Sequence, residues 1–319
     1  MSKNKKIISK PSKKLRRLAN KEITKQAVVV KELPSVIVIT KKAFLVLWNN
    51  KKFWLILLFW YLFFNLLFVK GFSSNLSVSN LKSQFEHLFS GTYSRFNSSL
   101  TVLLLLVGST TSNNVNQSTG AFNFFLLIFI SLIMIWSLIQ INQDKIPKVK
   151  DAIYRGIYPI VPFVLILFIL ALELLPATIG ASVYNIVKIN GIAAHAFEQV
   201  GWFIFFIGLL FWSLYMISSS IFALYIVVEQ NINPIAALKQ AKRLVSKRRL
   251  LVLRKILFLP LLIVVFLVII MIPSILLFSN FASWIFYLLT IIIIPIIHSY
   301  LYNLYQDLKQ SINLRLEKE

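Results

Sequence analysis

The chain has 319 residues and a formal net charge of +23 at pH 7, and 58% of its residues are hydrophobic. A soluble domain is about 45 to 50% apolar. This composition, with a mean hydropathy of +0.76, therefore excludes an ordinary soluble domain and requires surface that faces lipid. The absence of cysteine excludes disulfides, thiolate metal sites and a cysteine nucleophile. Charged residues make up only 14% of the chain and cluster between long apolar runs, as a bilayer demands.

The N-terminal segment, residues 1–33, begins with many Lys and polar residues and predicts a basic, largely disordered cytosolic tail. A cleavable signal peptide would place its apolar stretch within about the first 15 to 30 residues. Here the first apolar run begins near Phe53, so we interpret this run as a retained membrane anchor.

Six apolar runs are long enough to cross a bilayer, because about 20 helical residues span about 30 Å of hydrocarbon. They cover residues 53–69, 121–141, 157–179, 201–228, 256–278 and 284–304. The runs are apolar on every side instead of alternating, which favours helices over barrel strands. The sequence therefore predicts an all-α fold, a polytopic membrane bundle of about six transmembrane helices over residues 34–308, followed by a cytosolic tail at 309–319.

The segment between the first two spans, residues 71–120, is rich in Ser, Asn, Thr and Gly. This composition predicts a mobile external loop with one or two short helices. The apolar run at residues 100–107 makes only about 12 Å of helix and cannot cross the bilayer. We expect it to be interfacial or re-entrant.

The basic residues predict the orientation of the bundle. Residues 1–52, 142–156, 229–255 and 305–319 carry 15, 4, 8 and 3 Lys and Arg, whereas the segments on the other side carry only Lys70, Lys82, Arg95 and Lys188. The positive-inside tendency then places the N-terminus and the C-terminus in the cytosol. We expect a multi-pass protein of the cytoplasmic membrane.

Pro34, Pro147 and Pro234 form an internal regularity. Each opens a short stretch of apolar and basic residues that leads into the first, third or fifth span. Proline suits the first turn of a helix, so each can start a cytosolic elbow helix. Under this hypothesis the chain consists of three units of elbow, span and return span; the alternative is that prolines simply lie near membrane boundaries.

The segment 233–249 is the most specific one in the chain. Asn233 can cap a helix and Pro234 suits its first turn. Apolar residues at helical spacing form one face of this helix: Ile235, Leu238, Ala241 and Val245. We expect the helix to lie on the inner leaflet, where its cations bind the headgroups of anionic phospholipids. These cations are Lys239, Lys242, Arg243, Lys247, Arg248 and Arg249. The alternative is an ordinary basic loop with no specific ligand.

This part of the sequence resembles a known bacterial family. A span ending in small and aromatic residues, 215–225, leads into the Pro-x-x-Ala-Leu-Lys helix at 234–239, the basic run that follows it and then another span. The pattern resembles the membrane domain attached to some glycerophosphodiester phosphodiesterases, and also that domain's stand-alone six-span relatives. The matching residues cover about a quarter of the chain. The resemblance implies architecture alone, because the phosphodiesterase activity belongs to a soluble barrel of about 250 residues that this sequence does not contain.

A few polar residues fall within the spans. Glu173 is the only acid that we place inside one, and an ionisable residue in the membrane is by default a functional candidate. Its position about six residues from the outer end of the third span predicts access to interfacial water. His298, with Ser299, Tyr300 and the run Ser218, Ser219 and Ser220, predicts a polar seam between helices, whose simplest role is inter-helix hydrogen bonding.

No motif in the sequence identifies a reaction. His87, His195 and His298 are far apart and lack the spacings of a metal site. Asp144, Asp151 and Glu229 lie at the cytosolic boundary, where we interpret them as solvated charges. We expect no enzyme activity, metal or cofactor. We expect no specific nucleic acid partner either, because the basic runs lack interleaved aromatic residues.

The expected function is a structural or lipid-associated role in the cytoplasmic membrane, with the bilayer and the anionic phospholipids of its inner leaflet as partners. Two alternatives stay open. A small-solute transporter or channel would need polar groups that converge at mid-membrane. A lipid-modifying membrane enzyme would need acidic or histidine clusters at the cytosolic boundary.

Overall fold

The computed structural model describes residues 33–68, 117–192, 195–246, 248–278 and 281–316. Within these ranges all regular secondary structure is helical and no strand occurs, which confirms the all-α prediction. The predicted N-terminal tail up to residue 32, most of the predicted external loop and Lys247 lie outside the described residues.

Six helical segments in the described part of the chain are long and apolar enough to cross a membrane, as predicted. They are α3 (Lys51–Phe68), α6 (Gln117–Asn142), α8 (Ile160–Ile189), α9 (Ala196–Ser220) with its continuation α10 (Phe222–Gln230), α12 (Arg249–Leu277) and α13 (Ala282–Leu316).

Two of the predicted ends differ from the observed ones. Helix α8 continues ten residues beyond residue 179, and α13 continues through most of the predicted C-terminal tail. Gly180 has a packing role within the continued helix α8. A Cβ at Gly180 would lie 3.0 Å from the Leu209 Cδ1 of α9, so glycine lets α8 and α9 approach closely.

Each of the three prolines of the predicted regularity is followed by a short helix and then by a span. These elbow helices are α2 (Val36–Asn49), α7 (Val149–Gly156) and α11 (Pro234–Val245). The turns that lead into α7 and α11 share a further feature. Asp144 and Asn231, each three residues before the proline, have a left-handed backbone with φ of 55° and 52°. Asx residues tolerate this conformation, which ends a helix and reverses the chain.

The elbow helices pack in a cyclic order. Helix α7 packs against α6, α11 against α10, and α2 against α13, so each elbow contacts the return span of the preceding unit and the first unit closes on the last. Small residues lie on the buried faces of all three elbows: Ala43 on α2, Ala152 and Gly156 on α7, and Ala237 and Ala241 on α11. Small side chains let helix backbones approach closely inside a membrane protein.

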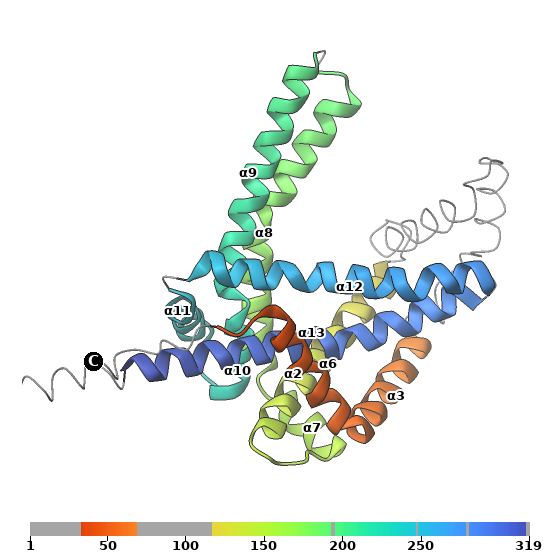
Figure 1. Ribbon diagram of the computed structural model, residues 1–319, viewed down its shortest axis with the longest axis vertical. Coiled ribbons are helices and arrows are strands. Elements are labelled where there is room, and N and C mark those ends of the chain that lie inside the picture. Colours follow the sequence, from red (N-terminus) through yellow and green to blue (C-terminus); the bar gives the residue numbers. More distant parts are fainter. Residues whose placement is uncertain (1–32, 69–116, 193–194, 247, 279–280, 317–319) are drawn as a thin grey trace, which may run out of the picture.

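The main hydrophobic core lies where these elbows meet the adjoining parts of the spans. From this base the α8–α9 pair projects away from the rest of the molecule, while α12 and α13 run across that direction (Figure 1). A second, smaller core joins α12 to α13 farther out. Only 6% of the most apolar stretch of the α9–α10 span is buried, so most of its apolar surface is available to lipid.

Substitution of Gly156 tests the packing of α7 on α6. A Cβ there would lie 3.0 Å from the backbone Cα of Ile133, so Gly156→Val should lower the free energy of unfolding by about 1 to 3 kcal/mol, the usual cost of overpacking. Gly208→Val is the matched control, because a Cβ at Gly208 meets nothing within 4 Å. Denaturant unfolding in detergent micelles, monitored by circular dichroism, measures the free energy of unfolding of both variants. Equal stability of the two variants would contradict the close contact.

Candidate functional site

Glu173 lies in the interior of the protein. Its side chain is 7% exposed, and its Oε1 accepts a hydrogen bond of 2.6 Å from the Ser220 hydroxyl at the end of α9. The Ser213 hydroxyl donates to the backbone carbonyl of Glu173 at 2.5 Å. The expectation of access to interfacial water is wrong, because α8 extends well past Glu173 and α9 covers the side chain. Glu173 therefore joins α8 to α9 inside the bundle.

The second carboxylate oxygen of Glu173 is buried and has no hydrogen-bond partner among the described residues. An unpaired buried polar atom costs about 1 to 3 kcal/mol, so the position carries an energetic penalty that a leucine would avoid. Glu173 lines neither the hollow beside α11 nor the cleft between α3, α6 and α7, and we therefore interpret the residue as a contact between helices rather than as part of a ligand site.

His298 joins three helices, but through residues other than those expected. Its Nδ1 lies 3.3 Å from the Tyr225 hydroxyl of α10, and its Nε2 lies 3.0 Å from the Ser131 hydroxyl of α6. Tyr225 is 1% exposed and its ring stacks on Tyr305. Hydrogen bonds across helices of this kind contribute about 0.6 kcal/mol each on average.

The other members of the predicted seam are dispersed. Ser299 donates to the Ala43 carbonyl at 3.0 Å, and the Tyr300 hydroxyl donates to the Lys255 carbonyl at 2.8 Å. Ser218 and Ser219 donate to carbonyls of their own helix, and only Ser220 reaches another helix. The expected single seam is therefore replaced by separate contacts, each of which ties two or three helices together.

Sequence reasoning did not foresee a further polar cluster between α3, α6 and α13. The Tyr287 hydroxyl donates to Asn65 Oδ1 at 2.8 Å, and the Asn65 amide donates to Asn123 Oδ1 at 3.3 Å. Asn65 is only 5% exposed. Isolated Asn and Tyr residues inside apolar runs were the only signal in the sequence, and they do not identify their partners.

Two acidic residues near the elbows, Glu229 and Asp307, form ion pairs. Glu229 accepts from the Tyr305 hydroxyl and, at 2.6 Å, from Lys309, and its side chain is 17% exposed. Asp307 pairs with Lys42 of α2 at 3.0 Å. Glu229 is therefore not the solvated charge that we expected. The C-terminal part of α13 lies against α10 and supplies the hydroxyl group of Tyr305 and the ammonium group of Lys309. Asp144 and Asp151 are exposed, as expected.

The basic helix α11 differs from its predicted orientation. Ala237, Ala241 and Val245 are fully buried against the protein, whereas Ile235 is 79% exposed. The buried face is thus rotated relative to the apolar face predicted from spacing. The rotation leaves Ile235 and Leu238 beside the cations Lys239, Lys242 and Arg243, and with Ser246 they line a hollow of about 700 Å³.

Arg248 and Arg249, the other predicted cations that the structure describes, do not line this hollow. The Arg249 guanidinium lies 5.2 Å from the centre of the Tyr215 ring, a cation–π contact with α9. Arg248 is half-buried, and Lys247 lies outside the described residues. The structure therefore brings together three of the six cations, and we call the surface formed by Ile235, Leu238, Lys239, Lys242, Arg243 and Ser246 the α11 surface.

Comparisons with models of known protein families, with curated proteins and with solved structures found no match to this chain. The resemblance to the membrane domain of glycerophosphodiester phosphodiesterases therefore stays a prediction. Within the described residues no three His, Asp or Glu side chains are grouped as a metal site would require.

Two adjacent serines give a matched test of the Glu173 contact. Ser220→Ala leaves the Glu173 carboxyl group without its hydroxyl donor, so it should lower the free energy of unfolding by about 1 to 3 kcal/mol. Ser219→Ala removes a hydroxyl that is equally buried but bonds only within its own helix, and it should cost less.

Denaturant unfolding in micelles compares the two variants. Adding Glu173→Leu to Ser220→Ala should recover part of the loss, because the buried carboxyl group is then absent. If Ser219→Ala and Ser220→Ala were equally destabilising, the hydrogen bond between Glu173 and Ser220 would contribute nothing measurable to the free energy of unfolding.

Proposed function

We propose that the protein is a lipid-associated integral protein of the cytoplasmic membrane, and that the α11 surface binds the phosphate groups of anionic phospholipids. The observation that carries this proposal is the arrangement of Lys239, Lys242 and Arg243 around one hollow, next to the exposed side chain of Ile235 and the half-buried side chain of Leu238. Cations beside apolar groups are suited to the boundary between lipid headgroups and acyl chains.

The expected electrostatic attraction between the α11 surface and anionic phospholipids is modest, but it is sufficient for a preference over neutral phospholipids. Each cation near an anionic leaflet contributes about 1 kcal/mol, so three give about 3 kcal/mol before screening by salt. Burial of the exposed Ile235 side chain in the interface adds an apolar contribution that salt does not weaken. Binding of lipid here would thus depend on ionic strength in part only.

The proposed orientation follows from the same charges. Helix α11 belongs to the side of the protein that carries 8 Lys and Arg in residues 229–255, and this bias favours the cytosol. The anionic phospholipids available to the α11 surface are then those of the inner leaflet.

A transporter is the second candidate, because Glu173 is an ionisable residue inside a span and has one unpaired oxygen. The polar groups of the described spans nevertheless occur as separate pairs and triads that join helices, rather than as one convergent set. We therefore favour the lipid-associated role.

A triple variant tests the α11 surface. Full-length protein with Lys239→Gln, Lys242→Gln and Arg243→Gln should lose most of the rise in melting temperature that phosphatidylglycerol gives over phosphatidylcholine in mixed micelles. The matched control neutralises three exposed cations elsewhere: Lys41, Lys52 and Lys145. The control should retain the effect. Equal loss in both triples would assign the lipid effect to net charge alone and contradict a site.

Labelling of single cysteines tests the orientation, since the chain has no native cysteine. Lys188 and Ser246 are both exposed and lie at opposite ends of the spans. In intact cells a membrane-impermeant maleimide should label Lys188→Cys, and it should label Ser246→Cys only after permeabilisation. Labelling of Ser246→Cys in intact cells would overturn the proposed topology.

A further inference from the structure

We propose that a cleft between α3, α6 and α7 binds one acyl chain of a membrane phospholipid. The cleft has a volume of about 300 Å³, at the lower end of the range for ligand pockets. Ten side chains line it: Leu57, Trp60, Tyr61, Phe64, Leu126, Phe129, Ile130, Ile133, Ile153 and Ile157.

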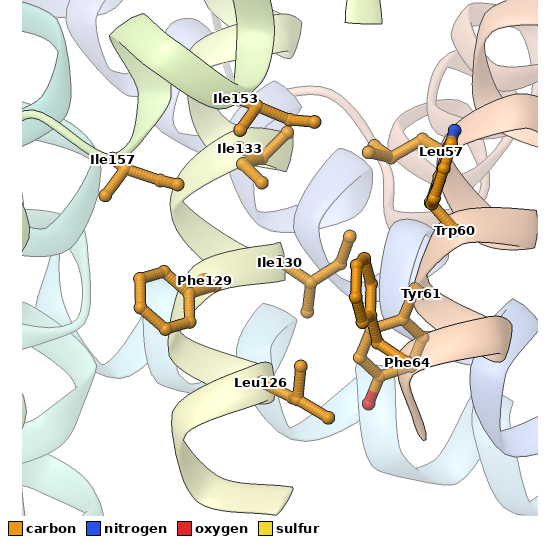
Figure 2. Close-up of a pocket in the computed structure, with 10 residues that line it drawn as sticks. All are labelled: Leu57, Trp60, Tyr61, Phe64, Leu126, Phe129, Ile130, Ile133, Ile153 and Ile157. Atoms are coloured by element: carbon orange, nitrogen blue, oxygen red, sulfur yellow. The ribbon is translucent and has the colours of Figure 1, made fainter. Parts of the chain in front are cut away.

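The cleft has two long walls, one from α6 and one from α3. Figure 2 shows the side chains of α6 along one wall and those of α3 along the other, with Ile153 of α7 and Ile157, which directly follows α7, at one end. Ile130 and Ile133 are buried, whereas Trp60 is 46% and Ile153 is 37% exposed. The interior is thus packed against protein while the rim is open at the side of the spans, where acyl chains surround a membrane protein.

The chemistry of the lining selects hydrocarbon. None of the lining residues is charged, and the Tyr61 hydroxyl already accepts a hydrogen bond of 3.5 Å from the Asn65 amide. A polar ligand would find almost no partner here and would lose its hydration. An alkyl chain would instead bury its methylene groups, each of which favours binding through the hydrophobic effect.

The direction and depth of the cleft match one leaflet. At 1.5 Å per residue, Leu57 lies about 9 Å and Phe64 about 20 Å along α3 from its first residue. The cleft therefore follows the helix axis from the level of the elbow toward the middle of a bilayer about 30 Å thick. A chain that enters beside α7 and runs along α3 and α6 has the path of an acyl chain in that leaflet.

A basic residue lies at the elbow end of the cleft. Lys150 precedes Ile153 by three residues on α7, and residues at this spacing lie on the same side of a helix. Lys150 is exposed and shows no ion pair among the described residues. Its ammonium group can therefore hold the phosphate of a phospholipid whose chain occupies the cleft, which favours a phospholipid over a neutral hydrocarbon.

Photocrosslinking of the full-length protein tests this site. The protein is reconstituted into vesicles that contain increasing fractions of a phosphatidylglycerol with a diazirine in one acyl chain, and mass spectrometry locates the adducts. Adducts on α3 and α6 residues of the cleft should saturate at about one per chain, as expected for a single site. Adducts on the exposed face of α9 should instead rise in proportion to the probe, since bulk lipid contacts that face.

Two bulky variants and a control complete the test. Ile153→Trp at the rim should weaken saturable labelling about tenfold, the loss expected when about two methylene groups can no longer be buried. Ile130→Trp should act in the same way from the interior. Ile207→Trp on α9 is the control, because Ile207 is 43% exposed and does not line the cleft, and it should leave the labelling unchanged.

Three outcomes would overturn the proposal. Labelling of the cleft that rises without saturation would show contact with bulk lipid only. Absence of adducts would show that another part of the chain fills the cleft. Full labelling of Ile153→Trp would exclude the proposed entry.

This site is independent of the α11 surface. The triple variant of Lys239, Lys242 and Arg243 should label normally, so failure of one proposal does not imply failure of the other.

Discussion

The packing of each elbow helix against the return span of the preceding unit gives the spans a common base. Three contacts, α7 on α6, α11 on α10 and α2 on α13, repeat the same relationship, and the third closes the chain on itself. Small residues make these contacts possible, because a larger side chain at Gly156 would push α7 away from the backbone of α6. One ion pair, between Lys42 and Asp307, also joins α2 to α13 at the closing contact.

This base also explains where the buried polar groups lie. A bilayer offers no water to hydroxyl, amide or carboxyl groups, so each must find a partner on a neighbouring helix or on its own backbone. Glu173 meets part of this requirement through Ser220, which joins the consecutive helices α8 and α9, and His298 meets it through Tyr225 and Ser131, which join α13 to helices far from it in sequence. Such short connections fix which helices are neighbours, whereas a conduction path would need polar groups that continue along one channel.

The lipid-facing features lie on the elbows or beside them. Because an elbow packs its small residues inward, its longer side chains face outward. On α11 these are Lys239, Lys242 and Arg243, and on α7 they include Lys150 and Ile153. The α11 surface and the cleft beside α7 thus arise from one structural principle. We propose that the first binds phosphate groups and that the second binds an acyl chain.

The sequence by itself determined the features that depend on neighbouring residues. The six spans follow from the length of the apolar runs, and the start of α11 follows from Pro234 in its first turn, whereas Pro147 precedes the N-cap of α7. Only the tertiary structure decided which polar groups meet. Ser220 lies 47 residues from Glu173, and Ser131 lies 167 residues from His298. It also decided that α11 buries Ala237 and exposes Ile235, because apolar spacing gives a helix an apolar side but does not specify which part of that side a neighbouring helix covers.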